Sequence, residues 1–205
     1  KQSLASVSSM VLDDPAHYGR IVKSPTLFEI VEYKDSTLVQ KKIREVNGGL
    51  YLFDTSFLVG AIKKIDNQNK GGEFYLPDLF KIAKKHKARM LVFQVKDADT
   101  LLGVNNFKEL AHAQKILYFR TAEKLMSDGI CIQEPLFTYI GRHVRVMPGC
   151  SIGPFTTIHG NSLIAKNVKV GAHCTLKDIS IGESSVIRDS CVLEDSEVGR
   201  HVMIG

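Results

Sequence analysis

Hydrophobic residues recur every six positions between residues 139 and 205. The series is carried by Ile140, Val146, Ile152, Ile158, Ile164, Val170 and Leu176. A five-residue step leads to Ile181, Ile187 and Leu193, and another leads to Val198 and Ile204. An α-helix has a period of 3.6 and a half-buried strand a period of 2, so neither explains the pattern. A parallel β-helix does, because each short strand points one aliphatic side chain inward before the chain turns a corner.

Small residues accompany this series. Glycine follows the aliphatic residue at Gly141, Gly153, Gly171 and Gly182. Small or β-branched residues stand four places after it, at Val144, Cys150, Thr156, Ser162, Val168, Cys174, Ser185, Cys191 and Val202. Three strands close a triangular coil, so the pattern predicts about four coils. The three cysteines of this set are expected in the wall of the coil, as structural thiols.

Strand and helix patterns alternate before the repeat. Strands are predicted at residues 4–12, 18–22, 28–32, 50–53, 90–95 and 130–132, with 90–95 buried. The second and third strands form an antiparallel hairpin, and residues 46–49 form a connection with two glycines. Helices are predicted at residues 36–45, 56–65, 77–86 and 106–128, with Ser36, Ser56 and Asn106 at their starts. We therefore expect a layered α/β domain over residues 1–137 and a β-helix over 138–205.

The composition narrows the class of protein. The net charge of +5 comes mainly from lysines on predicted helices, where alternation with apolar residues indicates solvated faces. The sequence shows no aromatic-interleaved basic stripe, so we expect no nucleic-acid partner. No apolar run approaches the ~18 residues of a membrane span, and the first residues do not resemble a signal peptide. We expect no membrane association and a cytoplasmic location.

Both ends of the sequence are unusual. Lys1 is not an initiator methionine, and Gly205 lies one residue into a new hexad. The edge of a β-helix exposes unpaired backbone groups and normally needs a cap. We therefore expect the sequence to be a fragment of a longer protein.

Five short motifs carry a resemblance to a known family. In order, they are Asp13-Asp14-Pro15-x-x-Tyr18-Gly19-Arg20-Ile21, Ile30-Val31-Glu32-x-Lys34-Asp35, Glu45-Val46-Asn47-x-Gly49, Gly72-Glu73-x-Tyr75-Leu76-x-Asp78 and Gly103-Val104-Asn105-Asn106. With the repeats that follow, the sequence resembles the bacterial bifunctional N-acetylglucosamine-1-phosphate uridyltransferase/glucosamine-1-phosphate acetyltransferase family. Each motif alone is weak, but five in order before a β-helix are specific.

The resemblance implies a fold and a reaction. The fold is a Rossmann-like nucleotidyltransferase domain, incomplete at its N-terminus, followed by a left-handed parallel β-helix that forms a homotrimer. The reaction joins UTP and N-acetylglucosamine 1-phosphate into UDP-N-acetylglucosamine and pyrophosphate, with Mg²⁺ neutralising the developing charge. In the family, coils further along the β-helix acetylate glucosamine 1-phosphate.

The resemblance also implies site residues. Gly19 would offer its backbone to the sugar, Glu32 would accept hydrogen bonds from sugar hydroxyls, and Asn47 would both donate and accept. Asn105 would be a neutral oxygen ligand to Mg²⁺. Without the family, these residues read as a hairpin glycine, a strand-end acid, a turn residue and a residue beside a helix cap.

Other positions are weaker site candidates or depart from the family pattern. Glu73 and Tyr75 are weaker candidates for lining the sugar pocket, and no residue of the chain is predicted to be catalytic. Family members commonly carry threonine at the positions of Gly48 and Pro77, which affects the exact sugar more than the reaction class. The family's phosphate loop, uracil-reading residues and metal-binding aspartate would precede Lys1, so we expect this fragment alone to be inactive.

Two alternatives stay open. One is a related sugar-1-phosphate nucleotidyltransferase that uses another base or sugar, since that superfamily also carries β-helices. The other is a non-catalytic trimer that binds a nucleotide sugar as a sensor.

Overall fold

The computed structural model describes residues 3–24 and 27–205. These fall into two compact units, Lys1–Gly103 and Val104–Gly205. The second unit contains the long helix α3 as well as the repeats. The assignment of separate functions to residues 1–137 and 138–205 stays a prediction.

The first unit is built on a five-stranded mixed sheet. Its strand order is β3-β2-β4-β1-β5, and only the β1–β5 pair is parallel. The strands are β1 (Ala5–Val11), β2 (Arg20–Lys23), β3 (Phe28–Val31), β4 (Glu45–Phe53) and β5 (Met90–Gln94). The hairpin predicted from residues 18–32 is confirmed, with Arg20 opposite Val31.

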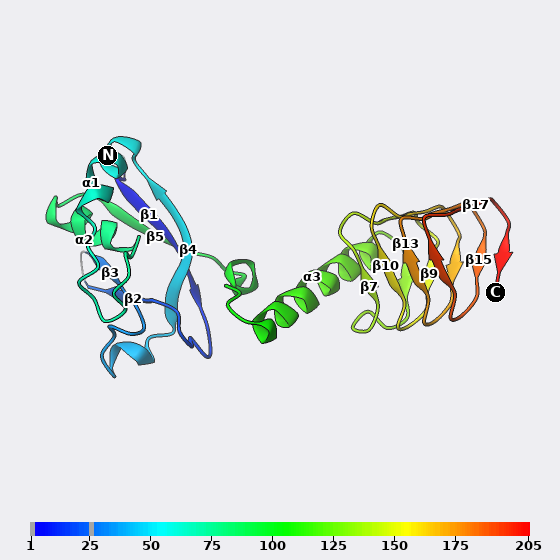
Figure 1. Cartoon of the computed structure of the whole chain (residues 1–205), viewed down its shortest axis with the longest axis horizontal. Coiled ribbons are helices and arrows are strands. Elements are labelled where there is room, and N and C mark those ends of the chain that lie inside the picture. Colours follow the sequence, from blue (N-terminus) through cyan, green and yellow to red (C-terminus); the bar gives the residue numbers. More distant parts are fainter. Residues whose placement is uncertain (1–2, 25–26) are drawn as a thin grey trace. The chain divides into compact units, whose positions relative to one another are not determined.

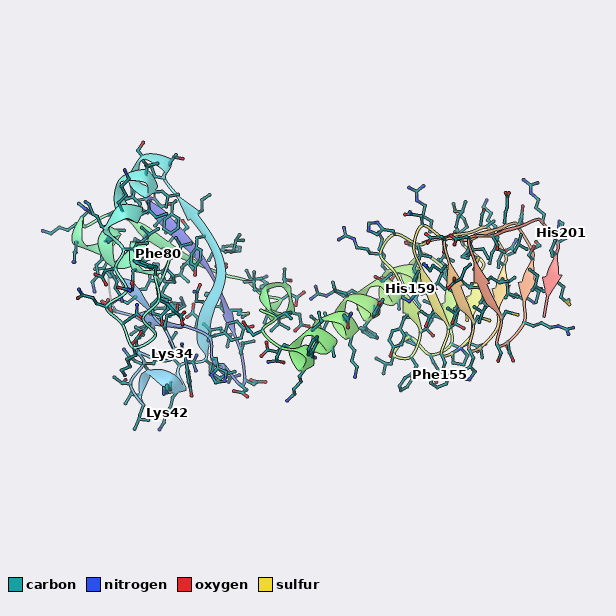
Figure 2. All side chains as sticks on the ribbon, in the orientation of Figure 1. Lys34, Lys42, Phe80, Phe155, His159 and His201 are labelled. Atoms are coloured by element: carbon teal, nitrogen blue, oxygen red, sulfur yellow. The ribbon has the colours of Figure 1, made fainter. Side chains whose placement is uncertain are left out.

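Two short helices cover one face of the sheet. They are α1 (Thr55–Ala61), continued by the 3₁₀ turn η2 (Ile62–Lys64), and α2 (Asp78–Lys85) (Figure 1). From α2, Phe80 points into the core of the unit (Figure 2), where its ring lies 5.5 Å from that of Phe28 and 5.3 Å from that of Phe53. These aromatic contacts join the helix to the central and edge strands, which fixes the covered face.

The predicted helix at residues 36–45 is wrong. Only the 3₁₀ turn η1 (Gln40–Lys42) forms there. The Ser36 hydroxyl donates back to the Glu32 carbonyl at 2.9 Å, so it closes a turn after β3 and does not cap a helix. Thr37 and Gln40 then exchange two backbone–side-chain bonds, of 2.9 and 3.2 Å. Local side-chain bonding of this kind competes with helix formation.

Strand β4 is longer than predicted. It begins at Glu45, so Asn47 lies in the strand and not in a connection before residue 50. The register shifts opposite Ser8, whose hydroxyl accepts a bond from the Leu50 amide at 3.2 Å. Gly48, Gly49 and Leu50 form the resulting irregularity opposite Ser8, and Gly49 has a left-handed φ of +75°. The two glycines therefore allow a bulge inside the strand, as glycine often does.

Two further expectations need correction. The first turn of α1 is capped by Asp54, whose Oδ1 accepts from the Phe57 amide at 2.9 Å, and not by Ser56. Strand β5 is an edge strand, and it is not buried: Phe93 is 69% exposed. Leu91 is also exposed, on the same sheet face as Leu52, because both lie opposite Ser6. A short apolar run does not show whether one or both faces of a strand are covered.

The second unit begins with α3 (Phe107–Ser127). As predicted, Asn106 caps it, accepting from the Glu109 amide at 2.9 Å. Along this helix, Ala122 is buried and Leu117 is 62% exposed. Near its end Leu125 packs against the β-helix core. Among the described residues, no helix is long and apolar enough to cross a membrane.

The repeats form a parallel β-helix, as predicted (Figure 1). One sheet contains β7 (Tyr139–Ile140), β10 (Thr157–His159), β13 (Thr175–Lys177) and β16 (Val192–Glu194). A second contains β8 (Arg145–Val146), β11 (Leu163–Ile164), β14 (Ser180–Ile181) and β17 (Glu197–Val198). The third contains β6 (Cys131–Ile132), β9 (Ser151–Ile152), β12 (Lys169–Val170), β15 (Val186–Ile187) and β18 (Met203–Ile204). The strand predicted at residues 130–132 is confirmed as β6, and it pairs with β9 ahead of the first hexad.

Stacked aliphatic residues fill the β-helix. Ile140, Ile158 and Leu176 stand in register on successive coils and are 0% exposed. The residues four places on close the corners: the Thr156 hydroxyl donates to the Gly171 carbonyl at 2.8 Å and accepts from the Cys174 amide at 3.1 Å. Bonds of this kind satisfy buried polar groups where the chain leaves the sheet ladder.

Coil stacking explains the glycines of the repeat. A β-carbon on Gly171 would lie 2.6 Å from the Asp189 amide nitrogen, and one on Gly153 would lie 2.6 Å from the Ala172 nitrogen. Both obstacles are backbone atoms of the next coil, so a side chain could not be accommodated by a rotamer change. Glycine is therefore required where neighbouring coils approach closely.

Candidate functional site

Three of the predicted sugar-binding residues come together in the first unit. Gly19 lies just before β2, Glu32 just after β3, and Asn47 within β4. The Gly19 carbonyl accepts from the Asn47 amide at 2.8 Å. A β-carbon on Gly19 would lie 3.1 Å from each carboxylate oxygen of Glu32. Because Gly19 has no side chain, its main chain and the Glu32 carboxylate can approach each other closely.

Glu32 occupies an acidic environment. Partial burial raises the pKa of its carboxyl, and Asp35, Asp78 and Glu73 raise it further. Lys81 acts in the opposite direction. Burial disfavours a charged carboxylate, and neighbouring negative charges do the same. A ligand that donates hydrogen bonds to Glu32 would stabilise its charged carboxylate.

The Asn47 side chain is oriented by its own strand. Its Nδ2 donates to the Tyr51 hydroxyl at 2.6 Å, and its Oδ1 accepts from the Gly49 amide at 3.0 Å. An amide group has two N–H donors and two acceptor lone pairs, so one of each is left for a ligand. The bulge in β4 therefore holds Asn47 in a fixed orientation through the Gly49 amide.

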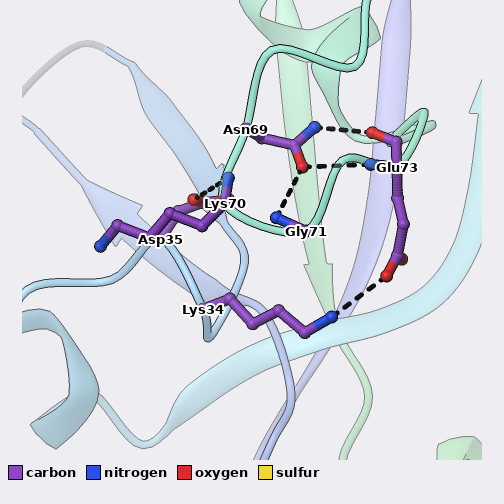
Figure 3. Close-up of polar contacts among 6 residues, drawn as sticks. All are labelled: Lys34, Asp35, Asn69, Lys70, Gly71 and Glu73. Atoms are coloured by element: carbon purple, nitrogen blue, oxygen red, sulfur yellow. Dashed lines mark hydrogen bonds and ion pairs between the residues drawn. The ribbon is translucent and has the colours of Figure 1, made fainter.

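Glu73 and Tyr75 line a pocket with Glu32. The pocket has a volume of about 190 Å³ and is also lined by His17, Tyr33 and Lys34. The carboxylate of Glu73 pairs with Lys34 Nζ at 3.1 Å, so it forms part of an ion pair at the rim (Figure 3). That ion pair also raises the pKa of Lys34.

The outer wall of this pocket is a polar loop before α2. Asn69 organises it, because Oδ1 accepts from the Gly71 and Glu73 amides at 3.0 and 3.3 Å and Nδ2 donates to the Glu73 carbonyl at 2.6 Å (Figure 3). The Lys70 amide donates to Asp35 Oδ1 at 3.1 Å. Together with the Lys34–Glu73 pair, this bond attaches the loop to the turn after β3.

Asn105 belongs to the second unit. Its backbone N–H and its Nδ2 both donate to Glu109 Oε2, at 2.7 and 3.1 Å, so its position is set by the start of α3. The amide Oδ1 is the kind of ligand that a hard cation such as Mg²⁺ takes. No group of three or more His, Cys, Asp or Glu side chains suited to a metal occurs in the described part of the chain. Asn105 therefore fits a magnesium site only as one ligand among several.

No family model matches the chain. The bifunctional protein GlmU of Geobacillus sp. (strain WCH70) is 36% identical over 203 residues, which cover 98% of this chain and 44% of the relative. The bifunctional protein GlmU of Bacillus velezensis is 35% identical over 207 residues, covering 100% of this chain and 45% of the relative. The corresponding protein of Fervidobacterium nodosum is 36% identical over 206 residues, covering 100% and 44%.

The chain is a relative of the bifunctional GlmU proteins. The similarity runs through both units, so it includes the segments that carry Gly19, Glu32 and Asn47 as well as the β-helix. The chain spans less than half the length of these GlmU relatives.

The structure gives a local reason for Gly48, where the resemblance implies threonine in many GlmU-type proteins. A β-carbon at this position would lie 2.5 Å from Leu101 Cδ1 and 2.7 Å from the Ser8 hydroxyl oxygen. Two side chains of this sequence thus occupy the space that a larger residue needs. Pro77, the second departure, takes the N-cap position of α2, where no side-chain cap bond forms.

Sequence reasoning missed several residues around the pocket. The rings of His17 and Tyr33 meet edge to face at 5.0 Å, and Lys41 Nζ lies 4.4 Å from the centre of the Tyr33 ring. Tyr33 stands at the unspecified position between Glu32 and Lys34 in the second motif. Its place between two motif residues is the sequence signal that marks it.

Proposed function

We propose that the first unit supplies the sugar-phosphate side of a nucleotidyltransferase site. The reaction is uridylyl transfer from UTP to N-acetylglucosamine 1-phosphate, giving UDP-N-acetylglucosamine and pyrophosphate. One observation carries the proposal: Gly19, Glu32 and Asn47, from three separate segments, meet in one small region. The similarity to bifunctional GlmU proteins supports the same reaction class.

The proposed chemistry depends mainly on positioning. Glu32 accepts hydrogen bonds from sugar hydroxyls, Asn47 donates and accepts, and Gly19 lets the sugar reach the main chain. An oxygen of the sugar phosphate then attacks the α-phosphorus of UTP in line. In such transfers, orientation and charge stabilisation account for most of the rate, so no nucleophile or base of this chain is needed.

Magnesium is the proposed cofactor. When bound, Mg²⁺ would neutralise charge on the nucleotide phosphates, and Asn105 would contribute one amide oxygen to it. We further propose that the β-helix associates as a homotrimer, in the cytoplasm where UTP is available. Sedimentation equilibrium of the chain tests the trimer, and a concentration-independent monomer would contradict it.

The sugar site can be tested without turnover. ¹⁵N NMR spectra of the 205-residue chain are recorded while N-acetylglucosamine 1-phosphate is added. We expect saturable shifts at the amides of Gly19, Glu32 and Asn47, and loss of the response in Glu32→Ala. Glu123→Ala, on the exposed side of α3, is the matched control and should respond like the unaltered chain.

A panel of sugar phosphates separates the proposal from its nearest alternative. Glucose 1-phosphate and galactose 1-phosphate should bind at least about tenfold more weakly. A sugar that lacks a matching polar group leaves the polar groups of the site without hydrogen bonds, and this lowers its affinity. Equal affinity for all three would argue for a different sugar. Shifts confined to other regions, or no shifts at all, would remove the proposed sugar site.

A further inference from the structure

Arg20 is a buried cation next to the proposed sugar site. It follows Gly19 at the start of β2 and is only 1% exposed. Arginine is almost never fully buried unless its charge and donors are matched. Its burial therefore requires an explanation from its partners.

The guanidinium of Arg20 is matched by backbone carbonyls. Nη1 donates to Pro15 O at 3.3 Å and to Tyr18 O, and Nη2 donates to Ala16 O at 3.1 Å. Nε and Nη2 both donate to Lys41 O, at 3.4 and 3.3 Å. These bonds use all five N–H donors of the planar guanidinium. Three of the four carbonyls lie in the short segment immediately before Gly19.

That segment has little regular structure of its own. Ala16 adopts a left-handed φ of +38°, and its amide donates to Asp14 Oδ1 at 3.0 Å. The Tyr18 amide donates to Pro15 O at 3.1 Å. The carbonyls of residues 15, 16 and 18 point toward one place, an arrangement that a cation stabilises. Burial lowers the pKa of Arg20, while Tyr33 and Asp14 favour the charged form; arginine stays protonated in proteins.

Arg20 also reaches the pocket wall. Its Cζ lies 5.4 Å from the centre of the Tyr33 ring, and Tyr33 lines the pocket beside Glu32 and His17. The same side chain thus contacts the segment before Gly19 on one side and the residue after Glu32 on the other.

We infer that Arg20 is a positioning residue for the sugar-phosphate site. Its guanidinium fixes residues 15–18, so that Gly19 faces the Glu32 carboxylate and His17 stands at the pocket wall. The inference rests on the proposed function of this site. Lysine cannot replace arginine here, because its ammonium has three donors and no planar fork.

The test compares two conservative substitutions. Arg20→Lys should weaken the binding of N-acetylglucosamine 1-phosphate about tenfold or more, measured by NMR titration of the 205-residue chain. Arg44→Lys is the matched control: Arg44 is half exposed, donates to Leu12 O at 3.1 Å and pairs with Asp13. It should leave the affinity within about twofold. Equal affinities in Arg20→Lys and the unaltered chain would overturn the inference.

A second variant addresses folding. Ala16→Gly leaves Arg20 in place and removes the strain of the left-handed residue, so the melting temperature should stay level or rise. It also makes the segment before Gly19 more flexible, and the affinity should fall about threefold, because order must then be imposed on binding. A merely structural role for Arg20 predicts unchanged affinity in this variant, and that result would count against positioning.

A ligand-free measurement separates the two proposals. In Arg20→Lys the amide signals of His17 and Gly19 should move, while those of residues 50–53 in β4 stay in place. If the unaltered chain binds no sugar phosphate, the proposed function fails, but these shifts still show whether Arg20 holds the segment. If they do not move, the positioning role fails whatever the chain binds.

Discussion

The carboxylate of Glu32 lies against the backbone of Gly19. The β2–β3 hairpin pairs Arg20 with Val31, and one step beyond this register Gly19 and Glu32 face each other. A hairpin thus brings a main-chain surface and a hydrogen-bond acceptor to the same point. A β-carbon at Gly19 would crowd both carboxylate oxygens, so a residue without one suits this close approach.

Replacing Gly19 by alanine tests this relationship. The new β-carbon would lie 3.1 Å from both Glu32 oxygens, so the carboxylate must shift by a few tenths of an ångström. We expect an affinity for N-acetylglucosamine 1-phosphate about tenfold lower, a loss of about 1.4 kcal/mol. Titration calorimetry measures it. Gly60→Ala, whose β-carbon would meet nothing within 4 Å, should bind normally, and normal binding by Gly19→Ala would show that the contact is unimportant.

Glu32 should make stability depend on pH. Its pKa in the folded chain is raised by burial and by neighbouring carboxylates. Between its ordinary pKa and this raised value, the folded state binds more protons than the unfolded state, so stability falls as pH rises through that window. Glu32→Gln removes the effect. Its melting temperature, relative to the unaltered chain, should therefore be higher at about pH 7.5 than at about pH 4.5.

The matched control for this experiment is Glu123→Gln, an exposed carboxylate on α3. It should change the melting temperature little at either pH. If Glu32→Gln lowers the melting temperature more at pH 7.5 than at pH 4.5, the ionised carboxylate stabilises the fold, and the acidic surroundings of Glu32 have been misread.

The β-helix should be sensitive to a methyl group at Gly171. The added carbon would lie 2.6 Å from the Asp189 nitrogen and 2.8 Å from the Arg188 carbonyl carbon. Because these are backbone atoms, the coils must separate locally, and we expect Gly171→Ala to lose about 2–3 kcal/mol of stability. Gly199→Ala places its carbon 3.7 Å from Val202 Cγ2 and should change stability by less than about 0.5 kcal/mol. Urea unfolding followed by circular dichroism compares them; equal stabilities would refute the stacking argument.

Gly48 provides a test of packing beside the candidate site. Gly48→Ala directs a carbon toward Leu101 Cδ1 and should cost about 1–3 kcal/mol. Shortening Leu101 to valine removes part of the obstacle. A double-mutant cycle should therefore give a favourable coupling of at least about 0.5 kcal/mol between the two changes. Strict additivity would mean that Leu101 does not restrict position 48.

The β-helix was the most predictable part of the chain. Its interior is built from one residue per strand at fixed spacing, so Ile158 and its equivalents can be read directly from the sequence. The hairpin around Gly19 and Glu32 was predictable for a similar reason, since it involves neighbouring segments. Strand β6 was also predicted, at residues 130–132, but its pairing with β9 was not, because it lies outside the hexads.

Other features depend on packing that the sequence does not show. Ser36 looked like a helix cap, but its hydroxyl bonds back to Glu32 O and ends a turn. The apolar run at β5 looked buried, although Phe93 lies on an uncovered face of the described unit. Arg20 was missed as a site residue because burial through four carbonyls leaves no sequence pattern. The roles of Gly19, Glu32, Asn47 and Asn105 came from the family resemblance and stay predictions.

The labelling rates of the cysteine thiols can report local opening of the β-helix. Cys150 and Cys174 are buried in different coils, Cys191 is partly covered, and Cys131 is exposed. Burial also raises the pKa of the Cys150 and Cys174 thiols, which slows their reaction in the folded state. A thiol-specific dye should therefore label Cys131 first. It should label the two buried thiols only when the coils that contain them open locally. Mass spectrometry of each labelled peptide would then show the order in which the coils of the β-helix open.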